Sequence, residues 1–248
     1  MIRYFTYVLL FTLVVFSFPA FAYKDPYNGL LNDYVSPTSA NNIQYAGVDY
    51  EAWKKDERHK KAVKSLLSIN PETFKTPEEK LAFWLNAYNL LTIDLILSTN
   101  EQENIKNQGA PLKTPWNTHK WRVHDTEYTL DQIAAKITQP HDDPRVYFAM
   151  TAAAKSSPDL RQEAYTHDML DAQLHDQVIE MFKNPTKGLK FEDEKLVRVS
   201  KIMDGSHKTA FAGGDLLKWL DFYFPEKIKP DTQIGFYNFD WSLNKKVK

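Results

Sequence analysis

The stretch Lys155-Ser156-Ser157 has residue types that could carry out nucleophilic chemistry. A serine hydroxyl becomes a nucleophile when a base lies within hydrogen-bond reach. Neighbouring residues of an extended chain point to opposite sides, however, so Lys155 is poorly placed to activate Ser156. Pro158 gives the ordinary alternative, a helix that begins at Ser157-Pro158 with the serine as its N-cap. The exposed amides of such a helix start, helped by Lys155, would also suit an anion.

Two amides, Asn86 and Asn89, lie within the otherwise apolar helical segment AFWLNAYNLLTIDLI. Their spacing of three puts them on one helix face, and a buried carboxamide is unfavourable unless it is hydrogen bonded. Either each amide pins a neighbouring loop or strand to the helix, or Asn86, Tyr88 and Asn89 line a pocket. Asp94 is a third polar group of that pocket or part of a salt bridge in the core. Asp240, at the end of the last predicted strand, closes the same pocket or caps a turn.

Metal and cofactor chemistry has little support in the sequence. His167, Asp171 and His175 follow one another at intervals of four on a predicted helix, which suits a metal ion. The same spacing is typical of a solvated helix face with surface ion pairs, and we favour that reading. The chain has no cysteine, which excludes thiol nucleophiles, disulfides and thiolate metal ligands. We expect no metal and no cofactor.

The elements that must position these residues can be read from the pattern. Thr76-Pro77-Glu78-Glu79 is a strong helix start with a capping box, and the helix from Pro77 to about Ser98 is apolar on every face, so it is expected to be buried at the centre. A hairpin is predicted over 121–128 and strands over 146–152, 196–202 and 233–241, with further helices after Thr129, Ser157, Thr166 and Gly213. This order predicts a single α+β domain with a mainly antiparallel sheet packed against the central buried helix and several shorter helices.

The N-terminal residues predict export. Arg3, the apolar run from Tyr4 to Phe18 and the small-residue pattern Ala20-Phe21-Ala22 are typical of a signal peptide, residues 1–22, that is cleaved. We therefore expect a periplasmic or secreted protein with no stable membrane span after cleavage. Residues 23–46 are polar and turn-rich and are predicted to be an irregular segment, followed by one globular domain over 47–248. A net charge of -1 argues against nucleic acid as a partner.

Several pieces of the sequence resemble one family. The segment LAFWLNAYNLLTIDLIL resembles the hallmark helix of the family catalogued as domain of unknown function 547. Five further pieces follow that family's order: VDYEAWKKD at 48–56, YTLDQI at 128–133, DPRVYFAM at 143–150, YTHDMLDAQL at 165–174 and YNFDWSLN at 237–244. The resemblance covers about residues 47–244. It implies a widespread family, often secreted by bacteria, without an agreed activity.

The resemblance also shows what this chain lacks. Family members commonly carry histidine at the position of Tyr147 and cysteine at the positions of Ala152 and Ser157. A Cys–His mechanism cannot operate with the residues present here. The resemblance therefore implies either a protein without catalytic activity or one that has moved its chemistry elsewhere.

Two functions follow from these observations. The first is an exported, non-catalytic domain, a pseudoenzyme that lacks the cysteine and histidine common in the family and binds a small molecule or an envelope protein. The alternative is a hydrolase with a distant papain-like or transglutaminase-like layout that uses residues other than cysteine. The candidate pocket is the same in both cases: Asn86, Tyr88, Asn89, Tyr147, Lys155, Ser156, Ser157 and Asp240.

Overall fold

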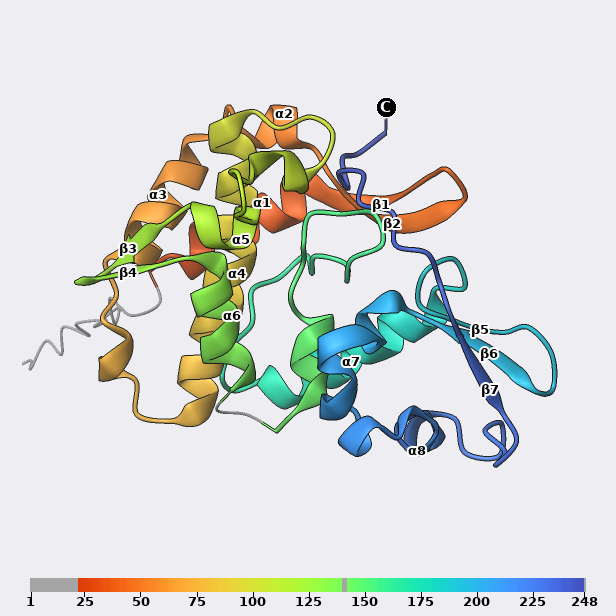
Figure 1. Cartoon of the computed structure of the whole chain (residues 1–248). Coiled ribbons are helices and arrows are strands. Elements are labelled where there is room, and N and C mark those ends of the chain that lie inside the picture. The colour runs from red at the N-terminus through yellow and green to blue at the C-terminus, as the bar shows by residue number, and fades with distance from the viewer. Residues whose placement is uncertain (1–21, 140–141, 248) are drawn as a thin grey trace, which may run out of the picture.

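The computed structural model describes residues 22–139 and 142–247, which form a single α+β domain (Figure 1). The helices are α1 (Lys24–Tyr34), α2 (Tyr50–Trp53), α3 (Glu57–Leu67), α4 (Pro77–Thr99), α5 (Pro115–Thr118), α6 (Leu130–Thr138), α7 (Leu170–Lys183) and α8 (Leu216–Tyr223). The strands are β1 (Val35–Ala40), β2 (Ile43–Val48), β3 (Trp121–Val123), β4 (Thr126–Tyr128), β5 (Leu189–Phe191), β6 (Leu196–Val199) and β7 (Gln233–Phe236). The predicted signal peptide lies outside the described residues apart from Ala22.

The helix α4 confirms the prediction of a buried central helix. The Thr76 hydroxyl accepts a hydrogen bond from the Glu79 amide, and the Glu79 carboxylate accepts one from the Thr76 amide, which completes the capping box. Asn100 ends the helix in the left-handed conformation, with φ 56°, which asparagine tolerates better than most residues. Every residue of 81–93 is buried. Among the described helices, α4 alone is long and apolar enough to cross a membrane, and it lies inside the protein.

Within residues 22–139 and 142–247, two hydrophobic clusters fill the interior. The central core surrounds α4 and takes side chains from α1, α3, α6 and the segment 146–165. The aromatic core lies between α7, α8 and the sheet β5–β7, on the right of Figure 1. In the aromatic core the ring of Phe148 stacks on Trp219 with centroids 5.7 Å apart and planes 5° apart, while Phe182 meets both rings edge-on. Offset and edge-on aromatic pairs of this kind add to the free energy gained by burial alone.

In the described part of the chain the strands form three small sheets rather than one. β1 pairs with β2, β3 with β4 and β5 with β6, all antiparallel, and β7 joins β6 in parallel. The hairpin predicted over 121–128 is confirmed as β3 and β4, while β6 and β7 are shorter than the strands predicted for them. A single sheet does not cover α4, because α3 and α6 pack against it instead.

The prediction that residues 23–46 are irregular is wrong. They form α1 and most of the hairpin β1–β2. α1 buries Tyr27, Leu30 and Leu31 in the central core, a stripe too short to stand out among its polar neighbours. β1 reads Val-Ser-Pro-Thr-Ser-Ala, which has the composition of a turn, yet all six residues pair with β2.

The strand predicted over 146–152 and the helix predicted at Ser157-Pro158 are also wrong. Residues Pro144–Phe148 form a 3-10 helix, and the chain from 149 to 169 has no helix and a single bridge residue, Ala154. The hydroxyl of Ser157 donates to the carbonyl of Ala154 three residues earlier at 2.7 Å, which folds the chain into a turn rather than capping a helix.

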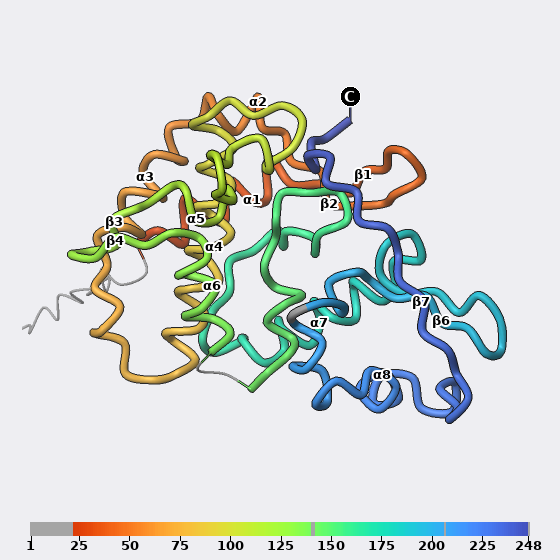
Figure 2. The backbone as a smooth tube through the Cα atoms, viewed as in Figure 1, coloured from red at the N-terminus to blue at the C-terminus, as the bar shows by residue number. Residues whose placement is uncertain are grey.

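The chain ends by joining three separate parts of the molecule. The amide of Val48 in β2 donates to the carbonyl of Asn244 at 2.8 Å, and the amide of Lys246 donates to the carbonyl of Val48 at 2.9 Å. The amide of Asn244 donates to Ala153, and that of Leu243 to Glu103. Figure 2 follows this last segment from β7 past the β1–β2 hairpin to the C-terminus.

Candidate functional site

Asn86 pins the chain around Tyr165 to α4. Its side-chain NH2 donates to the carbonyl of Tyr165 at 2.8 Å and to the hydroxyl of Tyr23 at 3.1 Å, and its oxygen accepts from the amide of Tyr165 at 2.8 Å. Both backbone groups of Tyr165 are thereby satisfied inside the protein. Burial raises the pKa of Tyr23, so its hydroxyl stays protonated.

Asn89 does the same for the segment that carries Ala149 and Thr151. Its NH2 donates to the carbonyl of Ala149 at 2.9 Å, and its oxygen accepts from the amide of Thr151 at 2.9 Å. The hydroxyl of Thr151 lies 3.2 Å from that of Ser157, so Asn89 is linked to Ser157 through one intermediate residue. The reading in which the amides pin neighbouring segments describes the contacts of both residues.

Tyr88 and Asp94 face other neighbours. The hydroxyl of Tyr88 accepts from the indole of Trp116 at 3.1 Å. Asp94 accepts from the ring Nε2 of His59 at 2.9 Å and from the indole of Trp121 at 2.8 Å.

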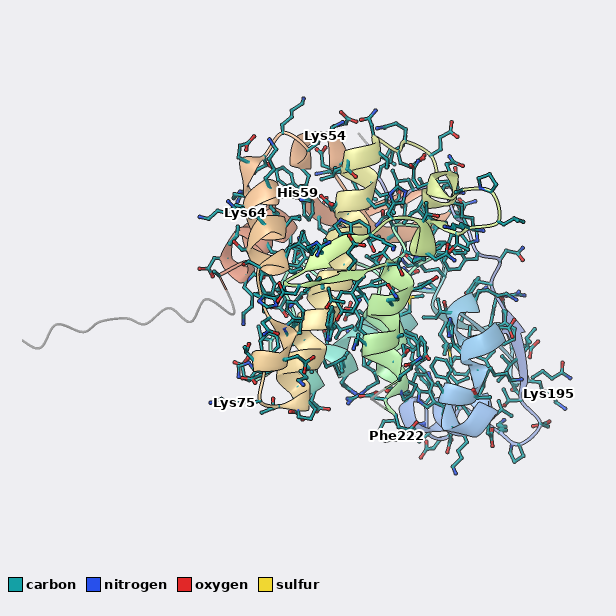
Figure 3. All side chains as sticks on the ribbon, turned by 60° about the vertical axis from the view of Figure 1, so that its left-hand side comes forward. Lys54, His59, Lys64, Lys75, Lys195 and Phe222 are labelled. Atoms are coloured by element: carbon teal, nitrogen blue, oxygen red, sulfur yellow. The ribbon has the colours of Figure 1, made fainter. Side chains whose placement is uncertain are left out.

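The tautomer of His59 follows from its second partner. The indole of Trp53 donates to Nδ1 of His59 at 3.1 Å, and an indole can only donate. Nδ1 therefore carries no proton, and Nε2 donates its proton to Asp94. Figure 3 shows His59 between α3 and α4. Both ring nitrogens are engaged, so this histidine orders the packing of α3 on α4 and has no lone pair left for a substrate.

Ser156 and Asp240 lie side by side, as a shared site would require, but they are hydrogen bonded to each other. The backbone amide of Asp240 donates to the Ser156 hydroxyl at 2.9 Å, and the amide of Ser156 donates to the Asp240 carbonyl at 3.3 Å. The carboxylate of Asp240 accepts from the amide of Ser242 at 2.8 Å, so it caps a turn. Among the described residues no histidine or carboxylate side chain bonds to the hydroxyl of Ser156 or Ser157.

Lys155 and Tyr147 complete the predicted set. Lys155 is buried, with its ammonium 6.0 Å from the centre of the Tyr45 ring. Tyr147 is half-buried, and its ring lies 4.6 Å from that of His207 and 5.9 Å from that of Phe211. Burial raises the pKa of Tyr147 and lowers that of His207, so both are neutral near pH 7.

A lysine that the sequence did not point to holds in place the loop that contains Ser156 and Ser157, here called the loop of the serines. Lys187 is 1% exposed, and its ammonium donates to the carbonyls of Lys155 at 3.1 Å and Ser157 at 2.8 Å and to the carboxylate of Asp159 at 2.6 Å. Burial lowers its pKa, while Asp159 acts against that shift. The sequence around it, Asn-Pro-Thr-Lys-Gly, is that of an ordinary loop and gives no sign of a buried ammonium.

A groove of about 960 Å³ is lined by residues of the β1–β2 hairpin and of α7. The segment 159–163 forms its third wall. Its lining residues are Asn32, Val35, Ser36, Pro37, Thr38, Ser39, Gln44, Tyr45, Ala46, Asp159, Leu160, Arg161, Gln162, Glu163, Asp176, Gln177, Glu180, Met181, Lys183 and Asn184. None of the eight predicted site residues is among them, and the pocket predicted from those eight stays a prediction.

Arg161 forms ion pairs with two carboxylates of the groove. Its guanidinium donates to Asp176 at 2.6 Å and to Glu163 at 2.8 Å, and it lies 3.3 Å from the side-chain oxygen of Gln177. Burial acts to lower the pKa of Arg161, but its hydrogen bonds to Asp176 and Glu163 raise the pKa above its ordinary value. Hydrogen bonds from Gln173 and Arg161 lower the pKa of Glu163. Arg161 and Glu163 are therefore both charged near pH 7.

Two buried side-chain atoms of the described residues have no hydrogen-bond partner: the hydroxyl oxygen of Ser36 and Nε of Arg161. Both residues line the groove. A buried polar atom without a partner costs about 1–3 kcal/mol, and native proteins contain few of them. The local sequence gives little sign of this site, because the hairpin wall comes from a stretch more than a hundred residues before the other two walls.

Metal ligation has no counterpart in the described residues, where no group of three or more histidine, aspartate or glutamate side chains is placed to hold an ion. Arg145 instead bonds to Asp171 at 2.8 Å, and the ring of His175 stacks on Tyr223.

Comparison with known proteins gives one match. A family model described as "Protein of unknown function, DUF547" matches residues 71–181, which confirms the resemblance over that span. No curated protein and no solved structure matches the chain. The matched span contains α4, the loop of the serines, the 159–163 wall and most of α7, while β1 and β2 lie before it.

Proposed function

We propose that this chain, which resembles the DUF547 family over residues 71–181, is an exported, non-catalytic domain that binds a ligand or partner in the groove between the β1–β2 hairpin and α7. One observation carries the proposal. The two buried side-chain atoms that lack a partner in the described chain, on Ser36 and Arg161, both belong to the lining of this groove. A bound molecule with hydrogen-bonding groups would offset that cost.

The absence of catalysis is supported by the loop that the family resemblance singles out. The hydroxyl of Ser156 is occupied by the amide of Asp240, and that of Ser157 by the carbonyl of Ala154. A serine nucleophile needs a base within hydrogen-bond reach. The hydrolase with a papain-like or transglutaminase-like layout remains the alternative function and is tested by turnover.

Export is supported by Arg3, the apolar run after it and the Ala20-Phe21-Ala22 pattern. Expression of the full chain in a bacterial host, followed by N-terminal sequencing of the periplasmic fraction, tests it. Recovery of a chain that begins at Tyr23 supports export and cleavage, and a chain that keeps residues 1–22 in the cytoplasm contradicts it.

Ligand binding is tested on residues 23–248 by thermal shift against a panel of amino acids, sugars, peptides and periplasmic extract. The matched variants are Arg161→Lys, which removes the Nε–H and keeps the charge, and Lys64→Ala, which changes an exposed lysine of α3 (Figure 3). A ligand that raises Tm in wild type and Lys64→Ala but not in Arg161→Lys supports the proposal. Equal shifts in all three proteins would place the site elsewhere, conversion of the ligand would establish the enzyme, and no shift with any member would count against binding.

A further inference from the structure

The outward edge of β1 is defined by the partners of β2. The amide of Gln44 donates to the Thr186 hydroxyl at 2.9 Å, and the amide of Ala46 donates to Asp159 at 2.7 Å, so both point away from β1. Backbone groups alternate along a strand, and therefore the residues between these two face β1. The register then assigns Ser36, Thr38 and Ala40 to the ladder with β2.

The other residues of β1 present their backbone groups to the open side. The carbonyl of Val35 accepts from the side chain of Gln162 at 2.7 Å on that side, which confirms the alternation. Pro37 has no N–H and occurs at one of these outward positions, where a strand can hold proline without losing a ladder bond. Beyond it, the carbonyl of Pro37 and the N–H and carbonyl of Ser39 have no partner within the described chain, and both residues are exposed. β1 is thus an edge strand. Gln162 bonds to its first outward carbonyl, that of Val35, and the outward groups of Pro37 and Ser39 are open.

This edge belongs to the groove. All residues from Val35 to Ser39 line it, together with residues of α7. A cleft between the edge of a strand and a helix is one of the recurring sites at which proteins bind an extended peptide, because the edge provides main-chain hydrogen bonds and the helix contacts alternate side chains.

The charge of the groove lining indicates the charge of the peptide that would bind there. The four carboxylates are Asp159, Glu163, Asp176 and Glu180, and the cations are Arg161 and Lys183, so the lining carries 2 − 4 = −2, or −1 when Lys187, which bonds to Asp159 from behind the lining, is included. The ammonium of Lys183 already pairs with Glu180 at 2.6 Å. A basic segment complements this wall, and the partnerless N–H of Arg161 would bond to a peptide carbonyl once the guanidinium turns toward it.

We propose that the groove binds an extended, basic polypeptide segment, which pairs with β1 as an added strand from Pro37 to Ser39 and directs its basic side chains toward the carboxylates of α7 and the 159–163 wall. This inference rests on the proposed function and names the class of its ligand.

The test uses residues 23–248 and two blocked synthetic peptides, an alternating lysine–threonine decamer and the matching glutamate–threonine decamer. The lysine peptide is expected to bind at low salt more tightly than the glutamate peptide, and to slow hydrogen exchange of the Ser39 amide by about tenfold or more in NMR, as one added main-chain hydrogen bond requires. Binding weakens as salt is added.

The variant Ser39→Pro removes the outward N–H at the edge, and Ser39→Ala keeps it. Ser39→Pro is expected to weaken binding of the lysine peptide by about tenfold, the equivalent of one hydrogen bond, and Ser39→Ala to leave it unchanged. Circular dichroism of both variants verifies that the hairpin has formed.

Three results would overturn the inference. Tight binding of the lysine peptide without protection of the Ser39 amide would place the peptide elsewhere. If neither peptide binds while a ligand of another class binds wild type and not Arg161→Lys, that result would support the proposed function and exclude a basic peptide as the ligand. A concentration-dependent dimer with Ser39 protected in the absence of peptide would assign the edge to a second copy of the chain.

Discussion

Helix α4 and the groove both hold buried polar side chains, but the two regions satisfy them differently. Along α4, the amides of Asn86 and Asn89 and the pair formed by His59 and Asp94 have partners for their polar atoms within the chain. Around the groove, Ser36 and Arg161 each leave one buried atom without a partner.

The difference separates two uses of buried polarity. A satisfied amide fixes a backbone segment and contributes to a unique fold, whereas a partnerless atom lowers stability. Proteins tolerate such a loss mainly where a site must remain ready for something else. The partnerless atoms of the groove therefore favour it as the place where a ligand would bind.

The largest expected effect comes from breaking a satisfied amide. Asn86→Ala leaves both the N–H and the carbonyl of Tyr165 buried without partners, and we expect it to lower the free energy of unfolding by about 3 kcal/mol. Urea unfolding measures it, with Asn32→Ala as the control, since that exposed side chain makes one bond within α1. A loss for Asn86→Ala no larger than that of the control would erase the distinction between the two regions.

The next effect concerns Lys187, which joins the loop of the serines to the groove through Asp159. Lys187→Met leaves two carbonyls without their donor and Asp159 without its cation, and should lower the free energy of unfolding by about 2 kcal/mol at pH 7.

The pH dependence of that variant has a definite sign. Because burial lowers the folded-state pKa of Lys187 below 10.5, the unfolded chain binds its proton more strongly over the window between the two values. The wild type should gain stability relative to Lys187→Met as the pH rises through this window. Unfolding series at pH 7 to 10.5 measure the difference, and a constant gap between the two proteins would contradict the assigned shift.

A matched pair of serines gives the smallest effects and the sharpest contrast. Ser157→Ala removes a hydroxyl that donates to the Ala154 carbonyl at 2.7 Å, and should cost about 1 kcal/mol. Ser36→Ala removes the partnerless hydroxyl and should be neutral or stabilising by up to about 1 kcal/mol. Differential scanning calorimetry resolves the two signs. Equal losses in both variants would mean that Ser36 is as well satisfied as Ser157.

The parts of the fold that could be predicted from the sequence are those set by local signals. The capping boxes at Thr76 and Thr129 and the uniform apolar character of α4 depend on residues close in the chain. The fold class follows from the same elements. The loop of the serines was misread because Ala153, with φ 53°, and the long-range bonds from Asn89 and Lys187 override its local preference for a strand and a helix.

The site was harder to predict than the fold for a physical reason. The groove forms only when the hairpin meets α7 and the 159–163 wall, and a partnerless atom has no sequence pattern. One local sign was present in β1: Pro37, flanked by small polar residues, is typical of an outward position in an edge strand.

The last segment of the chain, which joins β2, Glu103 and Ala153, has a consequence for the order of events in the life of the protein. Synthesis proceeds from the N-terminus, so these residues leave the ribosome well after the segments to which they bond. β2 and the loop of the serines therefore lack these backbone partners until residues 243–246 have been made. The contacts that join the hairpin to Glu103 and Ala153 are thus among those expected to form late in folding.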